Sequence, residues 1–110
     1  MQITTRSKGQ IAILELDGRF DANTAAPVKQ QLDRASEGGR VIVNLSGVQF
    51  VDSGGLATLV GGLKRCRQNG GDLYLCGLQQ PVQIIFELTK LQRAFDTFAS
   101  EAEAINAFST

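Results

Sequence analysis

Strand-like and helix-like segments alternate along the whole chain, and this alternation limits the folds that it can adopt more than any other feature. Strand-like runs span residues 3–6, 11–16, 40–45, 73–76 and 95–98. Segments with apolar residues at helical spacing span residues 24–37, 54–68 and 81–88, and a fourth begins at residue 100. Because helices connect most successive strands, these strands should pair in parallel through right-handed crossovers, while the short turn at 7–10 favours an antiparallel hairpin. We therefore predict an α/β fold in which about four helices pack on a small, mixed, mostly parallel β-sheet.

Local patterns refine this outline. Residues 41–43 are continuously apolar and β-branched, which indicates a strand covered on both faces. In the strand expected at residues 11–16, the odd-numbered and the even-numbered side chains should lie on opposite faces. Gly18 and Ser46-Gly47 should break these two strands, with residues 48–51 continuing in extended form. Gly61-Gly62 inside the second helix indicates either close packing on the sheet or a flat surface for a partner.

The composition excludes several classes of function. A length of 110 residues predicts one domain, spanning residues 1–110. Eleven Lys and Arg balance eleven Asp and Glu, and a net charge of zero argues against nucleic acids and anionic membrane surfaces as partners. No apolar run approaches the roughly 20 residues of a membrane span, and the first residues lack the apolar stretch of a secretory signal. We therefore expect a cytoplasmic protein with no membrane span.

The missing histidine removes most familiar catalytic and metal sites. Without it the chain cannot form a Ser-His-Asp triad, a Cys-His pair or a histidine-based metal site. Its two cysteines, Cys66 and Cys76, cannot make a four-thiolate zinc site and lack the Cys-x-x-Cys spacing. We interpret them as reduced thiols in the core and expect no metal and no cofactor.

One constellation stands out, between the best strand and the best amphipathic helix. Asp52 and Ser53 lie at the predicted start of the helix and are followed by Gly54 and Gly55. One interpretation is a plain helix cap, because either side chain can accept a hydrogen bond from the first turn. The other is a phosphorylation site, because free N–H groups at a helix start tolerate a phosphate on Ser53, and the two glycines leave room for a kinase. A serine nucleophile is disfavoured, because position 51 is valine where the Gly-x-Ser-x-Gly elbow needs glycine.

A second, smaller constellation closes the second strand at residues 16–21. Asp21 or Asn23 is expected to cap the helix that follows. If the neighbouring strands end at the same edge of the sheet, Asp21 lies near Asp52 and Ser53.

Taken in order, these segments resemble a known family. Residues 18–21 (Gly-Arg-Phe-Asp), the strand at 41–45, the motif Phe-Val-Asp-Ser-Gly-Gly-Leu at 50–56 and the stretches at 70–75 and 85–91 together resemble the STAS domain of bacterial anti-sigma factor antagonists. The resemblance covers nearly the whole chain. One departure is Gly54, where many members carry Ser or Thr after the phosphorylated serine.

The resemblance implies a function in transcription regulation and stress response. A family member of this kind is a binding module and not an enzyme; when unphosphorylated, it captures an anti-sigma factor that is also a serine kinase, and so frees the sigma factor. Phosphorylation of the motif serine breaks the complex, and a metal-dependent serine phosphatase restores it. By the resemblance, that serine is Ser53, and the partner-binding residues are Asp21, Asp52, Ser53, Gly54 and Gly55. Two alternatives stay open: a STAS subunit of a lipid-transport ATPase or stress-sensing complex, and a small enzyme that uses Ser53 or Cys66.

Overall fold

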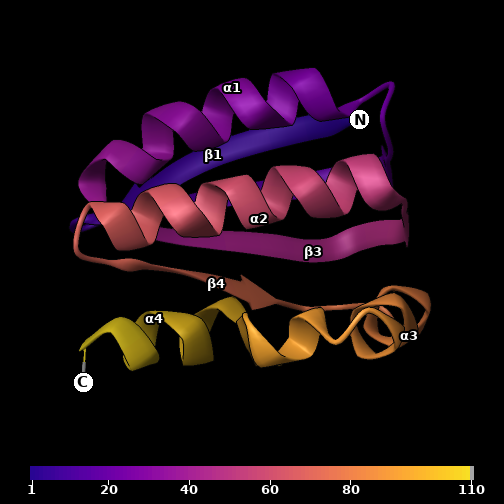
Figure 1. The fold of residues 1–110 in the computed structure, drawn as a ribbon. Helices are drawn as coiled ribbons and strands as arrows, with labels where there is room; N and C mark the ends of the chain where they lie inside the picture. The colour runs from indigo at the N-terminus through magenta and orange to yellow at the C-terminus, as the bar shows by residue number, and fades with distance from the viewer. Residues whose placement is uncertain (110) are drawn as a thin grey trace.

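The computed structural model describes residues 1–109, which form five strands and four α-helices (Figure 1). In chain order the elements are β1 (Gln2–Lys8), β2 (Ile11–Phe20), α1 (Ala25–Ala35), β3 (Arg40–Val51), α2 (Ser53–Gln68), β4 (Asp72–Cys76), α3 (Gln80–Leu88), β5 (Asp96–Phe98) and α4 (Glu101–Ser109). Short 3-10 turns follow α1 and precede β5, at Ser36–Gly38 and Leu91–Arg93. The predicted alternation of strands and helices is confirmed.

The strands form one mixed sheet in the order β1-β2-β3-β4-β5. β1 and β2 pair as an antiparallel hairpin, and the three remaining pairs are parallel. This is the predicted pairing, since a short turn joins β1 to β2 and helices join the later strands. The carboxyl ends of β2 and β3 therefore meet at one edge of the sheet.

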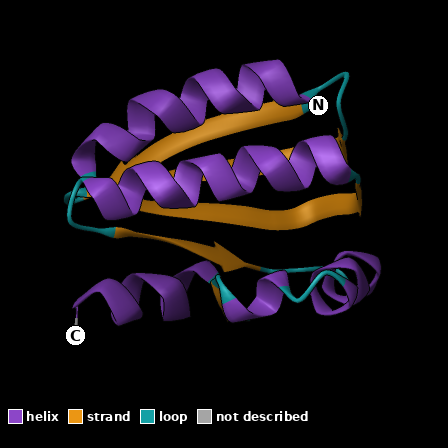
Figure 2. Ribbon diagram, viewed as in Figure 1, coloured by secondary structure: helices purple, strands orange, loops and turns teal. Residues whose placement is uncertain are grey.

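The helices cover the sheet unequally. Helices α1, α2 and α3 supply Val28, Leu59 and Phe86 to a core that also contains the even-numbered apolar residues of β2. The odd-numbered residues Ile11 and Ile13 face a smaller cluster closed by α4. Figure 2 shows α1 and α2 side by side along the strands, and α4 at the bottom of the view, where it covers the opposite face of the sheet. Every residue of 41–43 is buried, as the continuous apolar run predicted.

Both long strands continue past the points where we expected them to break. β2 runs through Gly18 to Phe20, and β3 runs through Ser46-Gly47 to Val51. The pairing register shifts on either side of Asp17, which is how the strands absorb these residues as bulges. A Cβ on Gly47 would lie 2.9 Å from the Leu16 carbonyl oxygen, so the close approach of the strands requires glycine there. β2 and β3 therefore extend together to the edge of the sheet where Ser53 lies.

The ends of the first and last helices differ in how well the sequence predicted them. The N-cap residue of α1 is Thr24, whose side chain makes no capping hydrogen bond. The prediction that Asp21 or Asn23 caps this helix is therefore wrong. The helix ends at Ala35, short of the predicted residue 37. At α4 the predicted start is confirmed: Glu103 N donates to Ser100 Oγ at 3.3 Å, and the Glu103 carboxylate accepts from Ala99 N at 3.0 Å, so residue 100 caps the helix.

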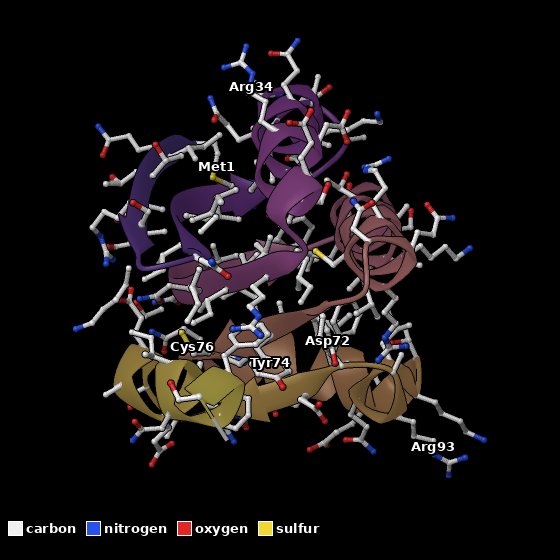
Figure 3. All side chains as sticks on the ribbon, turned by 90° about the vertical axis from the view of Figure 1, so that its left-hand side faces the viewer. Met1, Arg34, Asp72, Tyr74, Cys76 and Arg93 are labelled. Carbon is white, nitrogen blue, oxygen red and sulfur yellow. The ribbon has the colours of Figure 1, made fainter. Side chains whose placement is uncertain are left out.

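The two cysteines are free and buried. Desolvation raises the pKa of each thiol to about 11, so both are protonated near neutral pH. In Figure 3, Cys76 and Tyr74 point toward α4 on the far side of the sheet from α2. These are ordinary core thiols, as the sequence indicated. Among residues 1–109, none of the helices has the length and apolar content to cross a membrane.

Candidate functional site

The ends of β2 and β3 bring the two polar segments of the sequence together. Phe20 pairs with Val51 at the end of the ladder, and Asp52 N donates to the Phe20 carbonyl oxygen at 3.2 Å. The chain then turns into α1 on one side and directly into α2 on the other. Ala22 N donates to Asp52 Oδ2 at 3.2 Å, so the segment after Asp21 lies against Asp52 as the parallel pairing suggested.

Asp52 is the N-cap of α2 and holds both segments. Its Oδ1 accepts from Gly55 N at 3.0 Å, and its Oδ2 accepts from Ala22 N, so each carboxylate oxygen has a backbone donor. These bonds, that from Gly55 first, lower the pKa of Asp52, and Arg19 adds a smaller electrostatic contribution. Asp52 is therefore ionised at neutral pH.

Ser53 is the first residue of α2 and is exposed to solvent. Asp52, and not Ser53, supplies the helix cap, so the Ser53 hydroxyl is left without that task. Within residues 1–109 this hydroxyl accepts or donates no hydrogen bond. A phosphate could therefore be added to it without breaking a contact of the fold.

Packing inside the protein favours glycine at both positions after Ser53. A Cβ on Gly55 would lie 2.5 Å from the Phe20 carbonyl oxygen, and one on Gly54 would lie 3.0 Å from Ala22 Cα. Gly55 is also buried. These glycines therefore have a packing role, since they let α2 start directly against the end of β2. That they also leave room for a kinase stays a prediction.

The Asp21 carboxylate stabilises the turn that leads into α1, and the cation of Arg19 lies beside it. Its Oδ1 accepts from Asn23 N at 2.9 Å and from Thr24 N at 3.1 Å, while Oδ2 lies 3.5 Å from Arg19 Nε. The Arg19 guanidinium stacks over Phe50, 3.9 Å from the ring centroid. Sequence reasoning did not select Arg19 or Phe50 as site residues. Part of this pairing could have been predicted, since Arg19 and Phe50 each lie one residue before the paired strand ends, Phe20 and Val51.

Comparisons with known proteins identify a family. The sequence profile of the STAS domain matches residues 2–104. The chain belongs to the STAS domain family. An anti-sigma F factor antagonist of Paenibacillus polymyxa is 27% identical over 108 residues, which cover 96% of this chain and 92% of that protein. An anti-sigma-B factor antagonist of Staphylococcus aureus is 30% identical over 94 residues, 84% of this chain and 87% of that protein.

Solved STAS structures share the fold over nearly the full length. An anti-sigma-factor antagonist (STAS) domain protein from Planctomyces limnophilus superposes with a TM-score of 0.90 at 21% identity, covering 98% of both chains. The anti-sigma factor antagonist SpoIIAA in its unphosphorylated form superposes with a TM-score of 0.82 at 19% identity, covering 96% of this chain and 95% of that one. The Bacillus protein SpoIIAA in its phosphorylated form gives a TM-score of 0.74, also at 19% identity, covering 96% of this chain and 98% of that one. At these identities the likeness establishes the STAS fold.

Gly54 is the position at which the resemblance led us to expect Ser or Thr. In this chain a side chain there would press on the backbone of Ala22. Glycine at 54 leaves Ser53 as the exposed hydroxyl of the motif.

Proposed function

We propose that this chain is an anti-sigma factor antagonist whose binding is switched by phosphorylation of Ser53. In its unphosphorylated form it captures an anti-sigma factor that is also a serine kinase, and so releases a sigma factor. A metal-dependent serine phosphatase would reset it. The named relatives in Paenibacillus and Staphylococcus support the antagonist role, and SpoIIAA, which has been solved with and without phosphate, supports the switch.

The observation that carries this proposal is the exposure of an unbonded Ser53 hydroxyl at a fixed position. The bonds of Asp52 to Gly55 and Ala22 hold the backbone around it, so a partner meets a preformed surface. Two of the other hydroxyls are less suited. Ser36 is buried, and Thr58 donates to the Gly54 carbonyl oxygen at 2.9 Å. Ser46 is exposed and is the natural comparison.

An enzymatic role has less support. Both thiols are buried and protonated, and the sequence contains no histidine that could accept the proton of Ser53. A binding module of a single cytoplasmic domain fits these features better.

Incubation with the cognate kinase and ATP, followed by intact-mass analysis, tests the assignment. We expect one added phosphate on the wild type and on Ser46→Ala, and none on Ser53→Ala. Peptide mapping should place the phosphate on Ser53. A Ser53→Ala protein that is phosphorylated normally would contradict the proposal.

A further inference from the structure

The Arg19 guanidinium is held beside the site but is not saturated by the contacts that hold it. It stacks on Phe50, and its Nε lies 3.5 Å from Asp21 Oδ2, which is beyond the usual length of a charge-assisted hydrogen bond. Within the described part of the chain its N–H groups make no hydrogen bond. The side chain is 66% exposed. Arg19 is thus placed by an aromatic platform while its five donors remain available.

A short series of contacts connects this cation to the neighbours of Ser53. Arg19 is ion-paired to Asp21, and the next residue, Ala22, touches both neighbours of Ser53. Its N–H donates to Asp52, and its Cα lies 3.0 Å from the position of a Cβ on Gly54. Arg19 also contributes to the electrostatics of Asp52. Because Asp52 directly precedes Ser53, this contribution places the Arg19 guanidinium in the neighbourhood of the start of α2.

Phosphorylation creates a need for such a cation. A phosphate on Ser53 adds about −1.5 to −2 charges next to the ionised Asp52 and near Asp21. Arg19 is ion-paired with Asp21 and contributes to the electrostatics of Asp52, so it is a cation already placed beside both carboxylates. The planar guanidinium matches phosphate oxygens in a two-point contact, which its loose pairing with Asp21 does not provide.

We propose that Arg19 binds the phosphate of phosphorylated Ser53, using guanidinium N–H groups that are unbonded in the unmodified protein. This inference rests on the proposed function, in which Ser53 is the phosphorylated residue. Arg19 leaves Phe50 when it turns to the phosphate, so phosphorylation alters the partner surface at two points. Besides the charge added at Ser53, it uncovers the aromatic ring of Phe50, which is 39% exposed with Arg19 stacked on it.

Phosphoserine inserted at position 53 during translation tests this without kinase or partner. The second pKa of the phosphate, about 6 in an exposed phosphoserine, is read from the ³¹P chemical shift against pH. A nearby cation favours the dianion, so Arg19→Gln should raise that pKa by at least about 0.3 pH unit relative to wild type. Arg19→Lys keeps the charge but loses the two-point contact, and should recover part of the shift.

Arg34→Gln is the matched control. Arg34 is an exposed cation in the last turn of α1. Figure 1 shows that the end of α1 and the start of α2 lie at opposite ends of the two helices. This variant should leave the phosphate pKa within about 0.1 pH unit of wild type, since its charge is screened over that distance. Equal pKa values in wild type and Arg19→Gln would overturn the inference, and so would equal shifts in Arg19→Gln and Arg34→Gln. Neither outcome bears on whether a kinase modifies Ser53.

Discussion

Asp52 performs two tasks at one residue, and substitution can separate them. Its carboxylate caps α2 through Gly55, and it holds Ala22 against the site. Asparagine caps helices as well as aspartate does, but it carries no charge and offers only one acceptor oxygen. The pair Asp52→Asn and Asp52→Ala therefore distinguishes the cap from the charge.

We expect Asp52→Ala to lower the melting temperature by about 5–10 °C and Asp52→Asn to lower it by less, because alanine removes the cap. If the Asp52 charge orients Ser53 for the kinase, both variants should slow phosphorylation by a similar factor. Thermal unfolding and initial rates of phosphate incorporation measure the two effects. Normal phosphorylation of a folded Asp52→Asn protein would leave Asp52 with a structural role alone.

Glycines 55 and 61 of α2 make a second matched pair. A Cβ on Gly55 would collide with the Phe20 carbonyl oxygen, whereas one on Gly61 would only touch the end of the Arg65 side chain at 3.7 Å. Gly55→Ala should therefore lower the melting temperature by about 10 °C or more, because backbone must move. Gly61→Ala should leave it unchanged or raise it, since alanine favours a helix by up to about 1 kcal/mol. Circular dichroism melts compare them, and a well-folded, stable Gly55→Ala protein would be inconsistent with the packing of α2 on β2.

At the scale of whole elements, the close packing that was one interpretation of Gly61-Gly62 is found at Gly62 alone. A Cβ on Gly62 would lie 3.1 Å from Leu73 Cδ1 and 3.2 Å from Leu32 Cδ1, so this glycine lets α2 lie close to β4 and α1. Gly61 has no such neighbour and belongs to the outer surface of the helix. The sequence predicted the helix from its apolar spacing, but the facing of each glycine depends on the neighbouring elements.

The attachment of α4 is a contact that no local pattern could predict. Arg6 Nη1 and Nη2 donate to the two carboxylate oxygens of Glu101 at 3.0 and 2.7 Å, and Asn44 Nδ2 donates to Glu101 Oε2 at 2.7 Å. Glu101 thereby ties the start of α4 to β1 and β3. The bond from Arg6 is the main reason why the pKa of Glu101 is lowered.

Replacing Glu101 by glutamine should remove the charge part of this attachment. A depressed pKa in the folded state means that the ionised group stabilises the fold above its usual pKa of 4.5, and that this stability is lost as the pH falls through the lower folded value. At pH 7 we expect Glu101→Gln to lose about 1 kcal/mol or less, because Arg6 is partly exposed. Urea unfolding at pH 7 and pH 3 measures this difference, which should shrink at pH 3. The exposed Glu37 supplies the control Glu37→Gln, and equal effects of both substitutions would contradict the role of the Arg6 contact.

How far the sequence predicted the fold and the site follows from the range of the interactions involved. The order of strands and helices, the two-sided burial of residues 41–43 and the position of Ser53 depend on local periodicity and a contiguous motif, and they were predicted. The continuation of β2 through Gly18 was missed, because a bulge is recognised only when the partner strand is present. The contact of Ala22 with Asp52 and the stacking of Arg19 on Phe50 join residues about 30 positions apart, which only the parallel register brings together.

Across the whole molecule, the site lies on a rigid scaffold. β3 passes directly into α2, and β2 and β3 are paired up to Val51, one residue before the cap. Ser53 is exposed, and its hydroxyl holds nothing in place. The free N–H groups and the partial positive charge at the start of α2 also favour an added anion. We therefore expect the fold to change little when Ser53 is phosphorylated.

The binding of a partner responds differently to the same charge. An interface formed around an uncharged hydroxyl must, after phosphorylation, desolvate a dianion next to the ionised Asp52. Burial of unpaired like charges costs several kcal/mol, and about 1.4 kcal/mol corresponds to a tenfold loss of affinity. The switch is thus expected to lie in local electrostatics at the interface and not in a refolding of the domain.

We expect phosphorylated protein to keep its circular dichroism spectrum and a melting temperature within a few degrees of the unmodified form, while its affinity for the anti-sigma factor falls by about a hundredfold or more. Ser53→Asp carries a single charge and should reproduce part of that loss, whereas Ser53→Ala should bind constitutively. Calorimetric titration of the three forms and the wild type against the partner measures these affinities. Equal affinities would exclude the switch. A phosphoprotein with a changed spectrum and weakened binding would keep the switch but assign it to a conformational change, because charge at the interface alone leaves the backbone as it is.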